Sequence, residues 1–179
     1  MYLVLASGSE QKRRLAEYLA ARVGLGLRVK PVSTDESVLE DPEEMASINA
    51  VKKLEAVGAE IAIASDVFPY FRRPFLKPRS PEEARAMMKE LSGRWIEIVS
   101  ATAVKIGEKV ITHIDRVPVK IRSLDIAQRL ENPNIFKKSG TLTFTDIEVI
   151  KGNVYAVMGL NIDFAERVIT VYKEGLEFF

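Results

Sequence analysis

The sequence contains no cysteine and a single histidine, His113, among its 179 residues. The absence of cysteine excludes disulfide bonds, thiolate metal ligands and thiol nucleophiles, and it fits a reducing, cytoplasmic compartment. One histidine cannot build a histidine-rich zinc site, and it leaves little scope for a serine–histidine–aspartate triad. Any catalysis must therefore rely on carboxylates, lysines, hydroxyl groups or a hard metal ion.

Long hydrophobic runs and an excess of one charge are also absent. The longest uninterrupted apolar stretch is about six residues, far short of the roughly 20 that span a membrane. No charged segment followed by an apolar run begins the chain, and the net charge is +1, so we expect neither a membrane nor a nucleic-acid partner. With 47% hydrophobic and 28% charged residues, the composition is that of a globular enzyme of one domain.

The first third of the chain alternates strand and helix patterns. Apolar segments at 3–6, 25–29 and 61–64 predict strands, and apolar residues at helical spacing predict a helix over 10–22. A second helix is predicted to begin at Pro42, with Asp41 as its N-cap. Because the connections are short, this order predicts parallel strands joined by right-handed crossovers, that is, an α/β fold.

The rest of the chain adds strands that pair without such crossovers. A helix is predicted from Pro81 to Leu91, followed by a long strand that turns at 107–109 into a second strand ending at Ile121. A short helix is expected after Ser123, and short strands are expected around 142–145 and 154–158. The spacing of apolar residues over 165–176 predicts a C-terminal helix despite its β-branched residues.

The turn Ser7-Gly8-Ser9 lies between the first predicted strand and a helix that opens with Lys12 and Arg13. The first turn of a helix has unpaired backbone N–H groups and the positive end of the helix dipole, which together attract anions. Hydroxyl groups and a lysine at that point predict a phosphate-binding turn. An ordinary capping box, with Ser7 as N-cap and Glu10 at the third helical position, explains the same residues.

Carboxylates and lysines follow the other two parallel strands. Glu36 comes after the second strand and Asp66 directly after the third, while Lys53 lies on the intervening helix and Lys77 in the next loop. Ligands of open α/β sheets bind beyond the carboxyl ends of the strands, so these groups are expected to meet the phosphate-binding turn. Two carboxylates flanked by lysines would suit Mg²⁺, or Mn²⁺, together with a substrate that carries several phosphates.

Structural rather than functional explanations exist for several of these residues. Glu36 belongs to a polar run that is equally typical of a solvated loop, and a helical lysine such as Lys53 is usually a surface residue. Asp66 is harder to explain in this way, because an acid that follows four apolar residues is costly unless it is paired or binds a metal.

Taken together, these motifs resemble the Maf family of nucleoside triphosphate pyrophosphatases, which is related to the inosine triphosphatase family. The resemblance covers almost the whole chain, and Leu91-Ser92-Gly93-Arg94 is its most specific element. The other segments that carry it are Leu5-Ala6-Ser7-Gly8-Ser9, Asp35-Glu36, Ala50–Val57, Ala64-Ser65-Asp66, Leu76-Lys77-Pro78, Glu82-Glu83-Ala84, Lys138-Ser139-Gly140 and Val157-Met158-Gly159-Leu160.

The resemblance implies a mixed twisted sheet with flanking helices, two lobes around a central cleft, and a homodimer. It also implies hydrolysis between the α- and β-phosphates of non-standard or excess nucleoside triphosphates, with Mg²⁺ or another divalent cation as cofactor. The implied catalytic residues are Asp66, Glu36 and Lys53, the implied metal ligands are Glu36 and Asp66, and the implied phosphate-binding residues are Ser7, Ser9, Lys12, Arg13 and Lys77.

The chain departs from the family pattern at five positions. Two arginines of the family are Gln11 and Lys12 here, a threonine is Val67, a histidine is Ile96 and a glutamine is Thr145. These departures favour a second hypothesis, in which the chain binds nucleotides or a protein partner without hydrolysing them. A third hypothesis, an unrelated α/β sugar-phosphate enzyme, accounts for the strand ends but not for the segment from Lys77 to Arg94. The retained carboxylates and lysines favour the enzyme.

Overall fold

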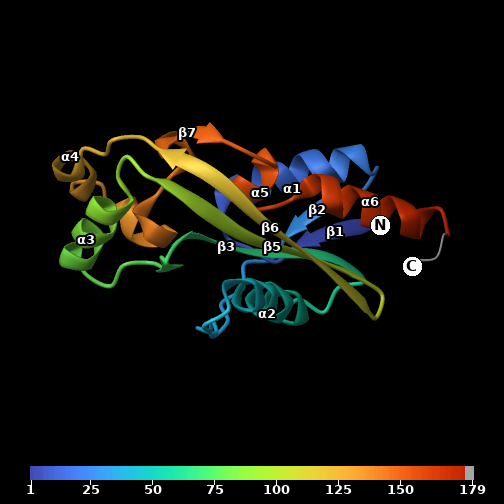
Figure 1. Cartoon of the computed structure of the whole chain (residues 1–179). Coiled ribbons are helices and arrows are strands. Elements are labelled where there is room, and N and C mark those ends of the chain that lie inside the picture. The colour runs from blue at the N-terminus through green and yellow to red at the C-terminus, as the bar shows by residue number, and fades with distance from the viewer. Residues whose placement is uncertain (176–179) are drawn as a thin grey trace.

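The computed structural model describes residues 1–175 of the chain and contains one twisted, mixed sheet in the order β2-β1-β3-β5-β6-β7 (Figure 1). A two-residue strand, β4, pairs with the far end of β3. The strands are β1 (Tyr2–Leu5), β2 (Gly26–Val29), β3 (Ile61–Phe71), β4 (Arg73–Pro74), β5 (Trp95–Ile106), β6 (Lys109–Ile121) and β7 (Ile147–Ile150). The α-helices are α1 (Glu10–Arg22), α2 (Pro42–Glu55), α3 (Pro81–Leu91), α4 (Ile126–Leu130), α5 (Val154–Val157) and α6 (Ile162–Lys173).

Strand direction divides the sheet into two parts, as the sequence predicts. β1 pairs in parallel with β2 and with β3, whereas β5, β6 and β7 are antiparallel to their neighbours. The two parts meet at β3, which is much longer than β1. Pairing between β1 and β3 covers only Val4 with Ala62 and Leu5 with Ile63, while β3 pairs with β5 from Ile61 to Tyr70. Between the end of β1 and the pairing with β4 at Tyr70, therefore, one edge of β3 is left open.

Helices cover both faces of the sheet (Figure 1). Because side chains alternate across a strand, Ile61 and Ile63 of β3 pack with α1 and α6, whereas Ala62 and Ala64 pack with α2 on the other face. α3 and α4 lie at the far end of the β5–β6 hairpin, where Met87 and Leu91 pack against strand residues such as Ile96. No helix within residues 1–175 is long and apolar enough to cross a membrane.

The helices begin where capping residues predict. Asp41 caps α2 by accepting from the backbone N–H groups of Glu43 and Glu44 at 2.8 and 3.1 Å, and Pro42 occupies the first helical turn. The capping-box interpretation of α1 assigns the N-cap to the wrong serine. Ser9, not Ser7, is the N-cap, and its side chain accepts from the N–H of Lys12.

Two of the expected strands are wrong. Residues 142–143 lie between the short 3-10 helices Ser139–Thr141 and Phe144–Asp146, residues 144–145 belong to the second of these helices, and the strand follows as β7. Residues 154–158 contain α5, because Asn153 caps this segment by accepting from the N–H of Ala156. An N-cap hydrogen bond thus overrides the strand preference of Val154 and Tyr155. The C-terminal helix forms as α6, from Ile162 to Lys173, and Leu176, which the prediction included, lies outside the described residues.

Candidate functional site

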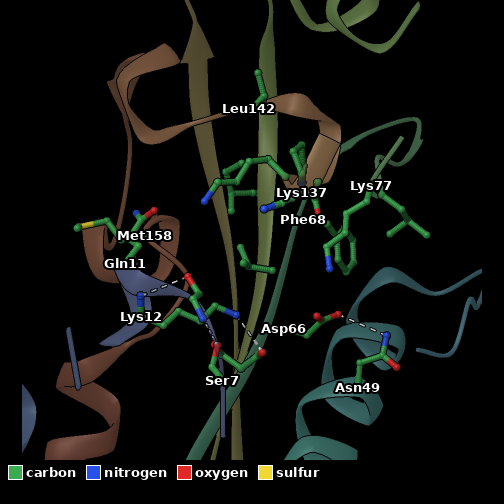
Figure 2. A pocket seen from close by; sticks show the side chains of 18 of the residues that line it. Ser7, Gln11, Lys12, Asn49, Asp66, Phe68, Lys77, Lys137, Leu142 and Met158 are labelled. Carbon is green, nitrogen blue, oxygen red and sulfur yellow. Dashed lines mark hydrogen bonds between the residues drawn. The ribbon is translucent and has the colours of Figure 1, made fainter. Parts of the chain in front are cut away.

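A cleft of about 750 Å³ opens along the free edge of β3 (Figure 2). The end beside Ser7 and Asp66, called the charged end, carries carboxylates, hydroxyl groups and lysines, and the other end is lined by apolar side chains together with Lys137 and Lys138 of the segment that precedes β7. The lining residues of the charged end include Ser7, Gly8, Ser9, Gln11, Lys12, Glu36, Asn49, Lys53, Asp66 and Lys77. Those of the other end include Phe68, Pro69, Ile98, Asn134, Lys137, Lys138, Leu142, Thr143, Phe144 and Ile147.

The turn between β1 and α1 forms one wall of the charged end. The Oγ of Ser7 accepts a hydrogen bond from the N–H of Ser9 at 3.2 Å, and the Oγ of Ser9 accepts from the N–H of Lys12 at 3.5 Å. The start of α1 therefore faces the cleft with two hydroxyl groups and the positive end of its dipole, a combination that attracts a phosphate.

Lys12 extends from α1 across the base of the cleft (Figure 2). Its Nζ donates to the carbonyl oxygen of Ser65 in β3 at 3.1 Å. Burial, and next the nearby charge of Lys53, lower the pKa of Lys12 from 10.5 to about 8, although Asp66 and Glu36 act in the opposite direction. Gly159 makes room for this side chain, since a Cβ there would lie 3.1 Å from Lys12 Cε.

Two carboxylates share one lysine beside this turn. The Nζ of Lys53 lies 2.8 Å from Oδ1 of Asp66 and 3.3 Å from Oε1 of Glu36. The side chains of Lys53 and Asp66 are only 14% and 13% exposed, whereas that of Glu36 is 44% exposed. Lys53 and Asp66 therefore form a largely buried ion pair at the base of the cleft, while Glu36 keeps access to solvent.

Asn49 of α2 fixes the same group from the other side, and sequence reasoning missed it. Its Nδ2 donates to Oδ2 of Asp66 at 3.4 Å and to the carbonyl of Ser37 at 3.0 Å, and its Oδ1 accepts from the N–H of Ser37 at 2.7 Å. Asn49 thus ties the loop that carries Glu36 to the aspartate. A buried polar residue on the inner face of α2, one turn before Lys53, was the available signal.

The position of Asp66 differs from the sequence prediction. The third strand does not end at Ala64 but continues through Asp66 to Phe71, because Val67–Tyr70 pair with the long strand β5. Asp66 reaches the cleft since β1 ends earlier and leaves its edge uncovered. The carboxylate of Asp66 therefore lies beside the end of β1, the neighbouring strand, rather than at the end of its own strand, β3.

Of the two remaining residues predicted to bind phosphate, Lys77 lines the cleft and Arg13 does not. Lys77 is exposed and lines both the main cleft and a smaller adjoining pocket, which it shares with Glu36 and Lys53. Arg13 is not brought to the cleft. It lies on the exposed side of α1 and pairs with Glu17 at 2.9 Å, because one residue along a helix turns the side chain by about 100° away from Lys12.

Lys137 and Lys138, both missed as functional candidates, line the opposite part of the cleft. Lys137 points into it near Phe68 (Figure 2). The sequence places them only in a loop next to a glycine, with no helical or strand period to orient them. Their place in the cleft depends on how residues 131–146, which include the 3-10 helix Pro133–Lys137, fold back over β3.

The donor set at the charged end fits a divalent cation completed by substrate. Mg²⁺ is usually held by one or two carboxylates, with water and phosphate oxygens filling its other positions. Glu36 and Asp66 supply two carboxylates on one lysine. Within residues 1–175 no group of three acidic or histidine side chains comes together, so a cage made entirely of protein ligands is not formed there.

Comparison with known proteins gives one family and a consistent set of relatives. The family model described as "Maf-like protein" matches residues 2–170. A protein named dTTP/UTP pyrophosphatase from Thermotoga maritima is 29% identical over 98% of this chain and 90% of its own length. Proteins of the same name from Anaeromyxobacter dehalogenans strain 2CP-1 and Cytophaga hutchinsonii are 32% and 31% identical, over 93% and 88% of this chain and 82% and 78% of their own lengths.

Proposed function

Because the chain belongs to the Maf-like protein family, we propose that it is a nucleoside triphosphate pyrophosphatase, which cleaves the bond between the α- and β-phosphates. The products are a nucleoside monophosphate and pyrophosphate. The observation that carries this proposal is the pairing of Asp66 and Glu36 on Lys53 directly beside the phosphate-attracting start of α1. Charged groups positioned around a phosphoryl group are the main requirement of this chemistry.

Each group has a distinct task. Ser7, Ser9 and Lys12 bind the phosphates from the side of α1, and Lys53 and Lys77 bind them from the side of α2 and the loop after β4.

Asp66 accepts a proton from the water that attacks the α-phosphorus, while Asn49 holds the carboxylate in place. The attack forms a new P–O bond and breaks the P–O bond to the β-phosphate, so pyrophosphate leaves with the electron pair. The lysines offset the charge that develops on the leaving group.

Glu36 and Asp66 would hold a divalent cation, Mg²⁺ or Mn²⁺. When bound, such an ion supplies positive charge to the phosphate oxygens and lowers the pKa of water. Glu36 suits this role because its carboxylate is the more exposed of the two.

We further propose pyrimidine nucleoside triphosphates, UTP and dTTP, as substrates, since relatives that align over most of the chain are named dTTP/UTP pyrophosphatases. A homodimer and a cytoplasmic location stay predictions from the sequence.

Pyrophosphate release from a panel of nucleoside triphosphates tests the reaction. We expect release from UTP and dTTP with Mg²⁺, at least tenfold slower release from ATP and GTP, and none with EDTA. Re-addition of Mg²⁺ or Mn²⁺ after EDTA should restore the rate. If no nucleotide yields pyrophosphate but several raise the melting temperature, the chain is a nucleotide-binding protein and the enzymatic proposal is wrong.

The lysines of the cleft can be tested separately. We expect Lys53→Ala and Lys77→Ala each to raise KM about tenfold, because a hydrogen bond to a charged group contributes about 1.5–3 kcal/mol. Lys89→Ala, an exposed lysine of α3 outside the cleft, is the matched control and should leave KM unchanged. Steady-state kinetics with UTP measure the effect. Unchanged KM and kcat in both cleft variants would remove these lysines from the site.

A further inference from the structure

A second ion pair with little solvent exposure joins α4 to the segment that lines the end of the cleft away from Asp66. Arg129 of α4 donates from Nη1 to Oδ1 of Asp146 at 2.6 Å and from Nη2 to the carbonyl oxygen of Thr141, also at 2.6 Å. The other oxygen of Asp146 accepts from the N–H and the hydroxyl group of Thr143 at 2.6 and 2.8 Å. The side chains of Arg129 and Asp146 are 17% and 6% exposed. We name these two residues the Arg129–Asp146 clamp.

The clamp holds a backbone that its own sequence does not favour. Thr141 has φ +61°, a left-handed conformation that is costly for a β-branched residue. Gly140 before it also has positive φ and packs so closely that a Cβ would lie 2.9 Å from Pro69 Cγ. Without the hydrogen bond from Arg129 to its carbonyl, Thr141 would lose a constraint that offsets this strain.

The segment fixed in this way forms the wall of the cleft opposite the phosphate-attracting turn. Leu142, Thr143 and Phe144 line the cleft and lie between the two points that the clamp holds, Thr141 and Asp146. Leu142 lies at the end of the cleft away from Ser7, Lys12 and Asp66 (Figure 2). Phe144 is 38% exposed, although it is a large apolar side chain.

A substrate with its phosphates at the charged end would place its nucleoside against this wall. We propose that Arg129 and Asp146 are positioning residues, which shape the Leu142–Phe144 wall for the nucleoside and leave the phosphate-binding end unaffected. The inference rests on the proposed function. Neither residue lines the cleft, so both act through the segment that they hold.

Separate binding of the two halves of the substrate tests this inference. UMP probes the nucleoside and one phosphate, and inorganic pyrophosphate probes the charged end alone, both by calorimetry with Mg²⁺. We expect Asp146→Asn and Arg129→Met each to raise the Kd of UMP about tenfold while changing that of pyrophosphate less than twofold. With UTP, KM should rise by a similar factor and kcat should change less than threefold. Arg122→Met, an exposed arginine outside the cleft, is the matched control.

Two measurements separate positioning from a general structural role. Arg129→Lys keeps the charge and one donor, so it should restore part of the UMP affinity that Arg129→Met loses; it also serves if Asp146→Asn does not fold. Equal loss of UMP and pyrophosphate binding, or unchanged UMP binding in folded variants, overturns the inference. If wild-type protein releases no pyrophosphate from any nucleotide, the proposed function fails while this comparison still decides the role of the clamp. Failure of wild-type protein to bind either probe overturns both.

Discussion

Asp66→Asn is expected to reduce kcat about 10²–10⁴-fold, the usual range for loss of a group that transfers a proton in the transition state. The amide has nearly the same shape but can neither accept the proton nor hold a cation with the same charge. It also leaves Lys53 with one carboxylate instead of two, since Lys53 Nζ then pairs only with Glu36 at 3.3 Å. The rate of pyrophosphate release from UTP measures the loss, and circular dichroism checks that the variant is folded.

Asp163→Asn provides the matched control for that substitution. Asp163 is half exposed on α6, where it pairs with Arg22 at 3.7 Å and does not line the cleft. The same chemical change there should leave the rate within twofold of wild type. Undiminished pyrophosphate release by folded Asp66→Asn protein would show that another group activates the water, with Glu36 as the first candidate.

The parallel direction of β1, β2 and β3 and the β5–β6 hairpin could be predicted, because short connections and period-two patterns constrain them locally. Helix α1 runs from Glu10 to Arg22, as its apolar spacing predicts, and α2 begins at Pro42 after its Asp41 cap. The two wrongly predicted strands fall between Leu142 and Met158, where β-branched and aromatic residues suggest strands. There the outcome depends on an N-cap at Asn153 and on the buried Asp146, and neither produces a periodic signal.

The charged end of the cleft could be predicted for a different reason. Ser7, Glu36 and Asp66 lie near points where the chain leaves parallel strands or passes beside their ends, and topology brings such points together. The opposite wall could not be predicted, because Thr141 and Asp146, on either side of Leu142 and Phe144, are bound by Arg129, which is 12 and 17 residues away from them in sequence. The sequence also could not show that Arg13 lies outside the cleft, since a shift of one residue along a helix separates a cleft residue from a surface residue.

Lys12 is expected to make phosphate binding depend on pH above about 8. Its pKa is lowered to about 8, first by burial and next by Lys53, so the free protein loses this charge as the pH rises through that value. A triphosphate favours the protonated form, and binding above pH 8 therefore requires uptake of a proton. KM for UTP should then rise by up to about tenfold per pH unit between pH 8 and 9.5. Lys12→Met should lower kcat/KM at pH 7 by about 10²-fold through loss of a charged hydrogen bond.

Lys12→Arg distinguishes this lysine from the other titrating groups around it. Arginine stays protonated throughout this range, so the variant should retain phosphate binding at pH 7 and show no rise of KM up to pH 9.5. The carboxylates that face Lys12, Asp66 and Glu36, and the other lysines, Lys53 and Lys77, are the same in both proteins. A slope common to wild type and Lys12→Arg would therefore assign the titration to one of those groups. Arg13→Ala, one residue along α1 and outside the cleft, should leave the wild-type slope intact. A lysine at position 12 thus gives the site a dependence on pH that an arginine would not.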